Sequence, residues 1–535
     1  MTQSSGHAPA PANRRRRPPE WYLAAAATIV VVALHLYFLK CAGGLFRDEV
    51  NSFNLARGPW STMAHDAFPV LFPFLLRLWI GLGLGGSDLS LRAFGVLMGL
   101  AMTGTFWLAA WWFRRRPPAW SLILVALNAW VIYYGAWLRA YGLGSAMIVL
   151  CAGAAWFFLE KPDRKTWLLF AASATLSVQT LYQNTALVAA ICAGACAVSV
   201  RQRNFKLAAG VFFGGFVAAI SLLPYWTIIF GMPEAASPLR MDFDGIVAFN
   251  NLNTVLAYPL PQFFWVWCGL AAVVALRAVA GIFSTNGDDR SLFAAVTLVG
   301  GCVTFTLFLW RANFPVQPWY FLPLVAVAGA VLESALPRLE GKFRALLWGG
   351  VAATALVSAG FAVRVLDCRF TNVDLLAKQV NATAGENDFA VVTPWQFGIT
   401  FGHYFTNRCA WETVPPIADH STERFDLLLA QMKNTNATQP LLERVGDTLR
   451  GGHTVWLVGG CGDAPGTNAP ASPPPPPLPR TGWHETPYRF AWNNQLGWYL
   501  RLHGAKIECL DPGTNENVNL VERLPLFKAT GWNNP

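Results

Sequence analysis

The feature of this sequence that most limits its fold is a series of long apolar runs separated by short basic loops. A helix needs about 20 apolar residues to cross the hydrocarbon core of a bilayer. Stretches near this length occur at 21–39, 93–113, 119–135, 141–159, 166–182, 184–200, 207–230, 256–280, 291–309, 318–335 and 345–365. Only 13% of the residues are charged, whereas soluble proteins carry about 25%. The sequence therefore predicts a polytopic α-helical membrane protein with about 11 transmembrane helices.

The distribution of basic residues predicts the orientation of the chain. The net charge of +10 would suit a nucleic-acid partner, but the arginines and lysines gather in short loops between apolar runs. The clusters at 114–116, 161–165, 201–206 and 338–344 fall in alternate loops, on the same side as the arginines at 14–17. Positive charge marks the cytoplasmic side of membrane proteins. We therefore expect a cytoplasmic N-terminus, an outer C-terminus and no nucleic-acid partner.

The same rule resolves two ambiguous stretches. Residues 68–84 are apolar but contain two prolines and an arginine, and counting them as a span would place every later basic loop outside. We expect them to form helices lying at the outer surface. Residues 167–200 would place basic loops on opposite sides if they formed one helix, so we predict a tight hairpin turning at Gln183-Asn184.

This topology divides the chain into three parts. We expect residues 1–19 to be a disordered cytoplasmic tail, 20–366 to be the transmembrane domain with outer loop 40–92, and 367–535 to be an extracytoplasmic domain. In the last part helical patterns alternate with short β-type runs, which predicts a small α/β domain. The expected helices lie at 373–382, 423–433 and 439–450, and the expected strands at 389–393, 454–458 and 506–510. Residues 465–482 contain five consecutive prolines and predict a loop without fixed structure.

Four of the ten cysteines fall in the expected outer domain, namely Cys368, Cys409, Cys461 and Cys509. An even number in an oxidising compartment permits two disulfides, in any of three pairings. Four free thiols are an equally open alternative. The spacing of cysteine and histidine does not indicate a structural zinc site.

Polar and aromatic residues collect at the outer ends of the expected helices. They come from different loops but share one membrane level: Asp48, Glu49, His65, Asp66, Arg139, Tyr141, Gln183, Asn184, Arg311, Trp319 and Tyr320. The inner loops carry basic clusters without a comparable set of acidic and aromatic groups. Acidic residues at the edge of a bilayer often mark a function. The one-sided distribution predicts a site that faces outward.

The acidic pair Asp48-Glu49, directly after the first apolar run, is the most distinctive part of this set. A solvated loop end would explain the dipeptide equally well when it is taken alone. A carboxylate in a low-dielectric site is, however, suited to accept the proton of an attacking hydroxyl group. We predict that the pair is catalytic, with Asp48 as the base and Glu49 in a structural or supporting role.

Five segments between residues 20 and 365 occur in a fixed order. They are Asp48-Glu49, His65-Asp66-Ala67-Phe68-Pro69-Val70-Leu71-Phe72, Ser90-Leu91-Arg92-Ala93, Leu138-Arg139-Ala140-Tyr141 and Pro318-Trp319-Tyr320-Phe321-Leu322-Pro323. In this order they resemble the motifs of the GT-C membrane glycosyltransferases that use lipid-phosphate sugars. This superfamily includes protein O-mannosyltransferases and aminoarabinose transferases, and rhizobial galacturonosyltransferases are the nearest type. The sequence departs from the family pattern where Phe68 replaces a proline and Trp319 replaces an arginine.

The resemblance implies a GT-C-like fold and transfer of a sugar from a polyprenyl-phosphate donor. The acceptor would be a hydroxyl group of a lipid such as lipid A, of another glycan or of a protein. The departing lipid phosphate needs stabilisation by arginine. Arg139 and Arg311 are the candidates, with Arg47 as a third.

The remaining candidates are expected to bind the substrate. His65 and Asp66 would orient the acceptor or the base. Tyr141, Trp319 and Tyr320 would line the sugar, although aromatic residues at this level also form interfacial belts. Gln183 and Asn184 are expected only to make the hairpin turn.

The resulting interpretation is an integral protein of a bacterial inner membrane, surrounded by membrane lipids, that requires no cofactor. A divalent cation bridging Asp48 or Asp66 to phosphate is compatible with it. A lipid or sugar transporter, such as a flippase, is a rival of a different class, which predicts paired internal repeats and polar residues at mid-membrane. A glycan polymerase or ligase is a second rival, which would use outer-loop arginines without the acidic pair.

Overall fold

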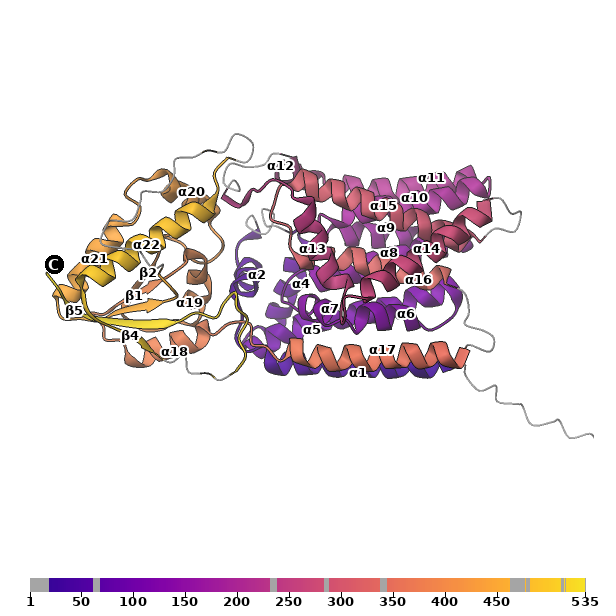
Figure 1. Cartoon of the computed structure of the whole chain (residues 1–535). Helices are drawn as coiled ribbons and strands as arrows, with labels where there is room; N and C mark the ends of the chain where they lie inside the picture. The colour runs from indigo at the N-terminus through magenta and orange to yellow at the C-terminus, as the bar shows by residue number, and fades with distance from the viewer. Residues whose placement is uncertain are drawn as a thin grey trace, which may run out of the picture.

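The computed structural model describes residues 19–60, 68–230, 238–282, 288–336, 344–461, 477, 482–510, 514 and 516–534. The chain forms a bundle of helices with a smaller α/β domain at one end of it (Figure 1). The predicted fold class, a polytopic helical protein with a small C-terminal α/β domain, is confirmed. Nearly all of the predicted tail 1–19 and most of the predicted loop 465–482 lie outside the described residues.

Eight helices in the described part of the chain are long and apolar enough to cross a membrane. They are α1 (Pro19–Cys41), α5 (Asp88–Arg114), α8 (Tyr141–Glu160), α10 (Asn184–Arg201), α14 (Phe263–Ile282), α15 (Asp289–Ala312), α16 (Leu322–Ala335) with the 3-10 turn Pro318–Phe321 before it, and α17 (Arg344–Leu366). These lengths and compositions identify an integral membrane protein.

Within the described residues, eight or nine helices qualify as full spans, fewer than the predicted 11, although the predicted stretches are largely helical. Helix α11 (Phe205–Ile220) and the segment Leu223–Ile229 together would make a ninth span, with a bend of 41° between them. The second segment overlaps α12 (Trp226–Phe230). Helix α9 (Arg164–Val178) has only 15 residues, or about 22 Å, which is shorter than the hydrocarbon core. It is separated from α10 by a short turn, so the predicted hairpin is confirmed.

The predicted span 119–135 is broken into α6 (Ala119–Ser121), a π-helical turn (Leu122–Ala126) and α7 (Ala129–Gly135). Asn128 causes the second break, because its Oδ1 accepts hydrogen bonds from the N–H groups of Trp130 and Val131 at 3.0 and 3.4 Å. An asparagine side chain used in this way caps a new helix. Its Nδ2 donates to the carbonyl of Val255 at 2.7 Å. The broken backbone is tolerated because the segment is almost wholly buried in protein.

Shorter helices lie near the end of the bundle that carries the α/β domain. They are α2 (Arg47–Arg57), α4 (Leu71–Trp79), which continues into a π-helical turn (Ile80–Leu84), and α13 (Gly245–Leu256). Residues 71–84 are thus helical, as predicted for the stretch 68–84.

Two glycines bring α5 and α8 close to the loop 136–140, which follows α7. A Cβ atom on Gly142 would overlap the carbonyl oxygen of Gly135, and one on Gly95 would overlap that of Ala136. Small residues let helices approach this closely. The packing therefore fixes the backbone of a loop that carries Leu138 and Arg139.

The C-terminal domain contains a five-stranded sheet in the order β2-β1-β3-β5-β4. Its strands are β1 (Phe389–Val392), β2 (Ala410–Thr413), β3 (Val455–Val458), β4 (Gly504–Leu510) and β5 (Leu526–Trp532). β1 runs parallel to β2 and β3, whereas β5 is antiparallel to β3 and β4. Its helices are α18 (Val373–Thr383), α19 (Gly398–Tyr404), α20 (Phe425–Lys433), α21 (Gln439–Arg450) and α22 (Glu485–His503), with a 3-10 turn at Trp395–Phe397.

Helices cover both faces of this sheet. Phe389 and Val391 of β1 pack with α20, α21 and α22, whereas Ala390 and Val392 pack with α18 and α19. Every residue of β1 and β3 is buried, as expected for central parallel strands covered on both faces. The three expected helices and three expected strands are all present, and the sequence analysis missed β2, β5, α19 and α22.

All ten cysteines lie within the described residues, and all are free thiols. Of the two alternatives for Cys368, Cys409, Cys461 and Cys509, the structure therefore contains the one without disulfides.

Polar contacts join the C-terminal domain to the end of the bundle. The hydroxyl of Tyr404 donates to Asp88 Oδ2 at 2.7 Å and accepts the N–H of Leu45 at 2.6 Å. Asn519 Nδ2 donates to the hydroxyl of Tyr133 at 2.6 Å. Since α5 starts at Asp88 and ends at Arg114, the basic cluster 114–116 lies at the opposite end of the bundle from the C-terminal domain.

Candidate active site

The acidic pair opens helix α2, which lies between the bundle and the C-terminal domain (Figure 1). Phe46 is the N-cap residue, and its N–H group donates to Oε2 of Glu49 at 3.3 Å. Negative side chains in the first turn favour a helix because they oppose the positive end of its dipole. The sequence Arg47-Asp48-Glu49 thus starts the helix and places its two carboxylates in different directions.

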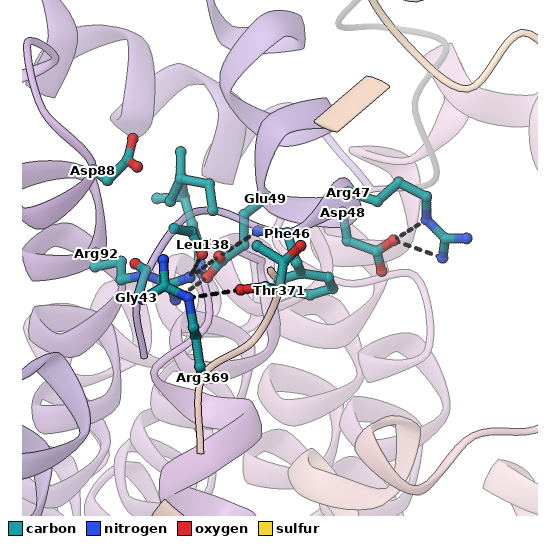
Figure 2. Close-up of polar contacts among 12 residues, drawn as sticks. Gly43, Phe46, Arg47, Asp48, Glu49, Asp88, Arg92, Leu138, Arg369 and Thr371 are labelled. Carbon is teal, nitrogen blue, oxygen red and sulfur yellow. Dashed lines mark hydrogen bonds and ion pairs between the residues drawn. The ribbon is translucent and has the colours of Figure 1, made fainter. Parts of the chain in front are cut away.

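Glu49 points into the protein and forms a buried ion pair with Arg92 of α5 (Figure 2). Arg92 Nη1 donates to Glu49 Oε1 at 3.0 Å, and Nη2 lies 2.9 Å from Oε2. The side chains are 0% and 1% exposed. The N–H group of Leu138 also donates to Oε1, at 3.1 Å. Glu49 therefore ties α2 to α5 and to the loop 136–140, and both its oxygens are already occupied.

Arg92 is itself held in place by contacts other than the one with Glu49. Its Nε donates to the carbonyl of Gly43 at 3.0 Å, and its Nη2 donates to that of Gly44. The ring of Phe370, from the C-terminal domain, lies 4.7 Å from its guanidinium carbon. This packing makes the Glu49–Arg92 pair part of the frame of the site. The sequence analysis had noted Arg92 only as part of a motif.

Asp48 points away from Glu49, toward Arg47 (Figure 2). Its Oδ1 accepts a hydrogen bond from Arg47 Nε at 2.9 Å, and its Oδ2 lies 3.8 Å from Arg139 Nη2. Burial raises the pKa of Asp48, but attraction to Arg47 and Arg139 outweighs this effect and holds the pKa below its usual value. The side chain is 13% exposed. Asp48 is therefore an ionised carboxylate that, in contrast to Glu49, has access to solvent.

Arg139 lies beside Asp48 in the loop 136–140. Its Nη1 donates to the carbonyl of Asp48 at 3.3 Å and to the hydroxyl of Ser52 at 3.2 Å. The guanidinium carbon lies 4.6 Å from the centre of the Phe68 ring, in a cation–π contact. The predicted neighbourhood of Asp48 and Arg139, 91 residues apart in the sequence, is thus present in the structure.

The three predicted aromatic residues lie against one another next to this pair. The Tyr141 ring packs on Phe68 and Tyr320, with centroid distances of 5.6 and 6.3 Å. Trp319 contacts Tyr320 at 6.1 Å and Trp137 at 5.2 Å. Tyr141 is buried, whereas Trp319 and Tyr320 are partly exposed. They form a continuous aromatic wall beside Arg139.

The other predicted residues are not all part of this group. Arg311 lies exposed in the last turn of α15. His65 and Asp66 lie outside the described residues. Gln183 and Asn184 do more than turn the chain, since Gln183 Nε2 donates to the carbonyl of Tyr320 at 2.9 Å and Asn184 Nδ2 donates to that of Gly144 at 3.0 Å.

Two acidic residues of the C-terminal domain also reach this region, and the sequence analysis missed both. Glu423 Oε1 lies 3.2 Å from Arg47 Nε, and Glu522 Oε1 accepts the N–H of Arg47 at 2.9 Å. Glu423 follows Asn51 of α2 by 372 residues, and Glu522 follows Arg47 by 475. The only sign of these contacts in the sequence is Arg47 itself, because a cation at the start of a helix needs acidic partners.

The described residues contain no group of three or more His, Cys, Asp or Glu side chains arranged to hold a metal ion. The arrangement of Asp48, Arg47 and Arg139 instead suits proton transfer to a carboxylate beside an anion that the two arginines hold.

A scan against protein-family models finds no match for this sequence, and neither does a search of curated proteins. The solved structures do contain similar folds. ArnT from Cupriavidus metallidurans bound to undecaprenyl phosphate matches 82% of this chain and 92% of its own, with a TM-score of 0.53 and 14% identity. The apo form of the Archaeoglobus fulgidus oligosaccharyltransferase matches 84% of this chain and 70% of its own, with a TM-score of 0.52 and 11% identity. Both are GT-C glycosyltransferases, so the chain has the GT-C-like fold that its motifs implied.

Proposed function

We propose that this integral membrane protein is a glycosyltransferase. It transfers a sugar from a polyprenyl-phosphate donor to a hydroxyl acceptor, which belongs to a lipid such as lipid A, another glycan or a protein. The reaction takes place at the outer face of a bacterial inner membrane. The observation that carries the proposal is the placement of Asp48 against Arg139 in a chain with a GT-C-like fold.

The two similar structures support both the class of reaction and the donor. ArnT was crystallised with undecaprenyl phosphate, which is the carrier part of such a donor. The orientation is supported by the basic cluster 114–116, which lies at the opposite end of the bundle from Asp48. Positive charge favours the cytoplasmic side. The acidic pair and the C-terminal domain then face outward.

In the proposed reaction the acceptor oxygen attacks the anomeric carbon of the sugar. The new bond joins the acceptor oxygen to this carbon, and the bond between the carbon and the phosphate oxygen breaks. Asp48 accepts the hydroxyl proton, because it is ionised and faces away from the buried Glu49–Arg92 pair. The lipid phosphate leaves with the bonding electron pair, and Arg139 stabilises its charge, assisted by Arg47.

The surrounding residues hold this geometry and bind the sugar. Glu49 acts as an anchor, since its ion pair with Arg92 fixes the first turn of α2. Tyr141, Trp319 and Tyr320 are proposed to line the sugar-binding region, because their rings continue the surface on which Arg139 lies. Arg311, His65 and Asp66 remain proposed contacts of the donor or the acceptor. No cofactor is required by this scheme.

Replacement of Arg139 by lysine is expected to lower sugar transfer at least about tenfold, because lysine keeps the charge but lacks the planar fork that holds two phosphate oxygens. Arg139→Ala should be weaker still. Transfer is measured with the purified protein in lipid nanodiscs, using polyprenyl-phosphate sugars as donors. Arg364→Lys is the matched control, because Arg364 lies in the last turn of α17 and packs on the ring of Phe361. Full activity of Arg139→Ala would remove Arg139 from the site.

The transporter alternative is tested in sealed vesicles. A flippase moves the lipid-linked sugar across the bilayer without changing its mass, whereas the proposed enzyme releases the polyprenyl phosphate and adds the sugar to an acceptor. Vectorial movement without any new glycosidic bond would contradict the proposed function.

A further inference from the structure

Helix α2 has polar contacts with the C-terminal domain as well as with the bundle. Besides the two contacts of Arg47, the N–H group of Glu423 donates to Asn51 Oδ1 at 3.2 Å. Asn54 Nδ2 donates to the carbonyl of Ser421 at 2.7 Å. On the opposite side Glu49 binds Arg92 of the bundle. The helix that carries Asp48 therefore lies clamped between two separately folded parts of the chain.

Glu522 caps the N-terminus of α2. The first N–H groups of a helix have no partner within it, and the N-cap residue Phe46 has no side-chain oxygen to accept one. Glu522 supplies the missing acceptor from a position 475 residues later. It is 2% exposed, and attraction to Arg47 together with a side-chain contact to Thr371 offsets part of the cost of its burial.

Glu423 acts on the side chain of Arg47. The guanidinium group of Arg47 lies between two carboxylates, with Nε 2.9 Å from Asp48 Oδ1 and 3.2 Å from Glu423 Oε1. Its five N–H donors are fixed in one plane. The position of Glu423 thus determines the plane of the guanidinium group, and this plane determines where Asp48 is held.

We propose that Glu522 and Glu423 are positioning residues of the active site. They fix the first turn of α2 and the side chain of Arg47, and through them the carboxylate of Asp48. Sugar transfer then requires the C-terminal domain to be docked on the bundle. This inference rests on the proposed role of Asp48 as the base.

The electrostatics of the cluster give the proposal a signature that depends on pH. Asp48 interacts with Arg47, Arg139, Tyr141, Tyr320 and Glu522, and Arg47 links it to Glu423. Burial raises the pKa of Glu522 to about 7, although attraction to Arg47 opposes the rise. A carboxylate caps a helix better when it is charged. The raised pKa, however, shows the net effect: the docked state favours the protonated carboxyl, so the hold of Glu522 on the first turn of α2 should weaken as the pH rises toward about 7.

The first test is hydrogen exchange of the full-length protein in nanodiscs, followed by mass spectrometry of peptides that cover 45–57. Glu522→Ala removes both the acceptor and the charge, and we expect exchange in α2 to become roughly fivefold to tenfold faster, as loss of a helix cap implies. Glu522→Gln keeps an acceptor oxygen but has no charge. It should show a smaller effect and lack the fall in protection that the wild type shows between about pH 5 and pH 7, after correction for intrinsic rates. Glu423→Gln should also accelerate exchange.

The second test measures function with the same variants. Cells that carry each variant in place of the wild type are analysed for the sugar increment that the protein adds to envelope acceptors. Glu522→Ala and Glu423→Gln should reduce its rate of appearance roughly tenfold or more, because small displacements of a catalytic group are costly. Glu516→Gln is the matched control, since Glu516 belongs to the same loop but is 63% exposed and pairs with Arg369. It should change neither measurement, and peptides from α5 should exchange alike in all variants.

The two measurements separate the possible failures. Unchanged exchange of α2 in Glu522→Ala would overturn the inference and leave the proposed function intact. Faster exchange with a wild-type rate of sugar addition would also overturn it, because α2 would then be held for stability alone. Absence of any sugar increment from the wild type would overturn the proposed function, and this inference with it.

Discussion

Asp48→Asn is expected to slow sugar transfer by at least about a hundredfold, since general-base assistance is typically worth 10²–10⁴-fold. Asparagine has the same size and keeps one oxygen for Arg47, but it cannot accept the proton of the attacking hydroxyl group. Because the pKa of Asp48 is lowered, the wild-type carboxylate is ionised at neutral pH. Binding of undecaprenyl phosphate should persist in the variant, since Asp48 lies outside the spans and Arg139 is unchanged.

The measurement is single-turnover transfer alongside binding of undecaprenyl phosphate in nanodiscs. Asp244→Asn provides a matched control, because Asp244 caps α13 with its side chain and asparagine caps a helix about equally well. Retention of more than about a tenth of the wild-type rate by Asp48→Asn would show that Asp48 is not the base.

The second large effect is expected on stability. Arg92→Met leaves the carboxylate of Glu49 buried without its cation, and Glu49→Leu leaves the guanidinium of Arg92 without its anion. Removing one partner of a buried ion pair destabilises a protein by about 3–5 kcal/mol. The double variant, which carries both substitutions, should recover a large part of this loss because no uncompensated charge remains. The free energies of unfolding of the three variants, measured in detergent, form a double-mutant cycle.

The exposed pair Arg450–Asp447 gives the comparison for this cycle, since its side chains are 51% and 71% exposed. Asp447→Asn should change the unfolding free energy by no more than about 1 kcal/mol. If Arg92→Met were as mild as Asp447→Asn, Glu49 would not be the anchor of α2. The expected difference between Asp48→Asn and Glu49→Leu, one losing activity and the other stability, follows from the opposite directions of two neighbouring side chains.

The sequence alone predicted the membrane fold because hydropathy acts over whole helices. Nearly every apolar stretch became one helix, since about 20 apolar residues have few alternatives in a bilayer. The stretch 119–135 broke into pieces because the single residue Asn128 caps a new helix. A hydropathy value averaged over a window of residues does not register a single side chain that caps a helix. Strands β2 and β5 were missed because their pairing with β1 and β3 comes from residues distant in the chain.

The candidate site was predictable only in part. The types of residue near the outer surface indicated Asp48 and Arg139, and the structure brings them together. The prediction of Asp48 as the base and Glu49 as a supporting residue could not be argued from contacts, since their partners lie 43 and 91 residues away. Arg92 and Glu522 contribute through burial and through contacts between domains. Neither property has a periodic pattern in the sequence.

The central claim is that this protein adds a sugar to an acceptor and that Asp48 is required for the reaction. Mass spectrometry of envelope lipids and glycans tests it most directly, in cells that carry the wild type, Asp48→Asn or no copy of the protein. We predict that one sugar increment is present only with the wild type, and that the polyprenyl-phosphate sugar accumulates in the other two strains. Identical envelope glycans in all three strains, with no change in the lipid-linked sugar, would contradict the account.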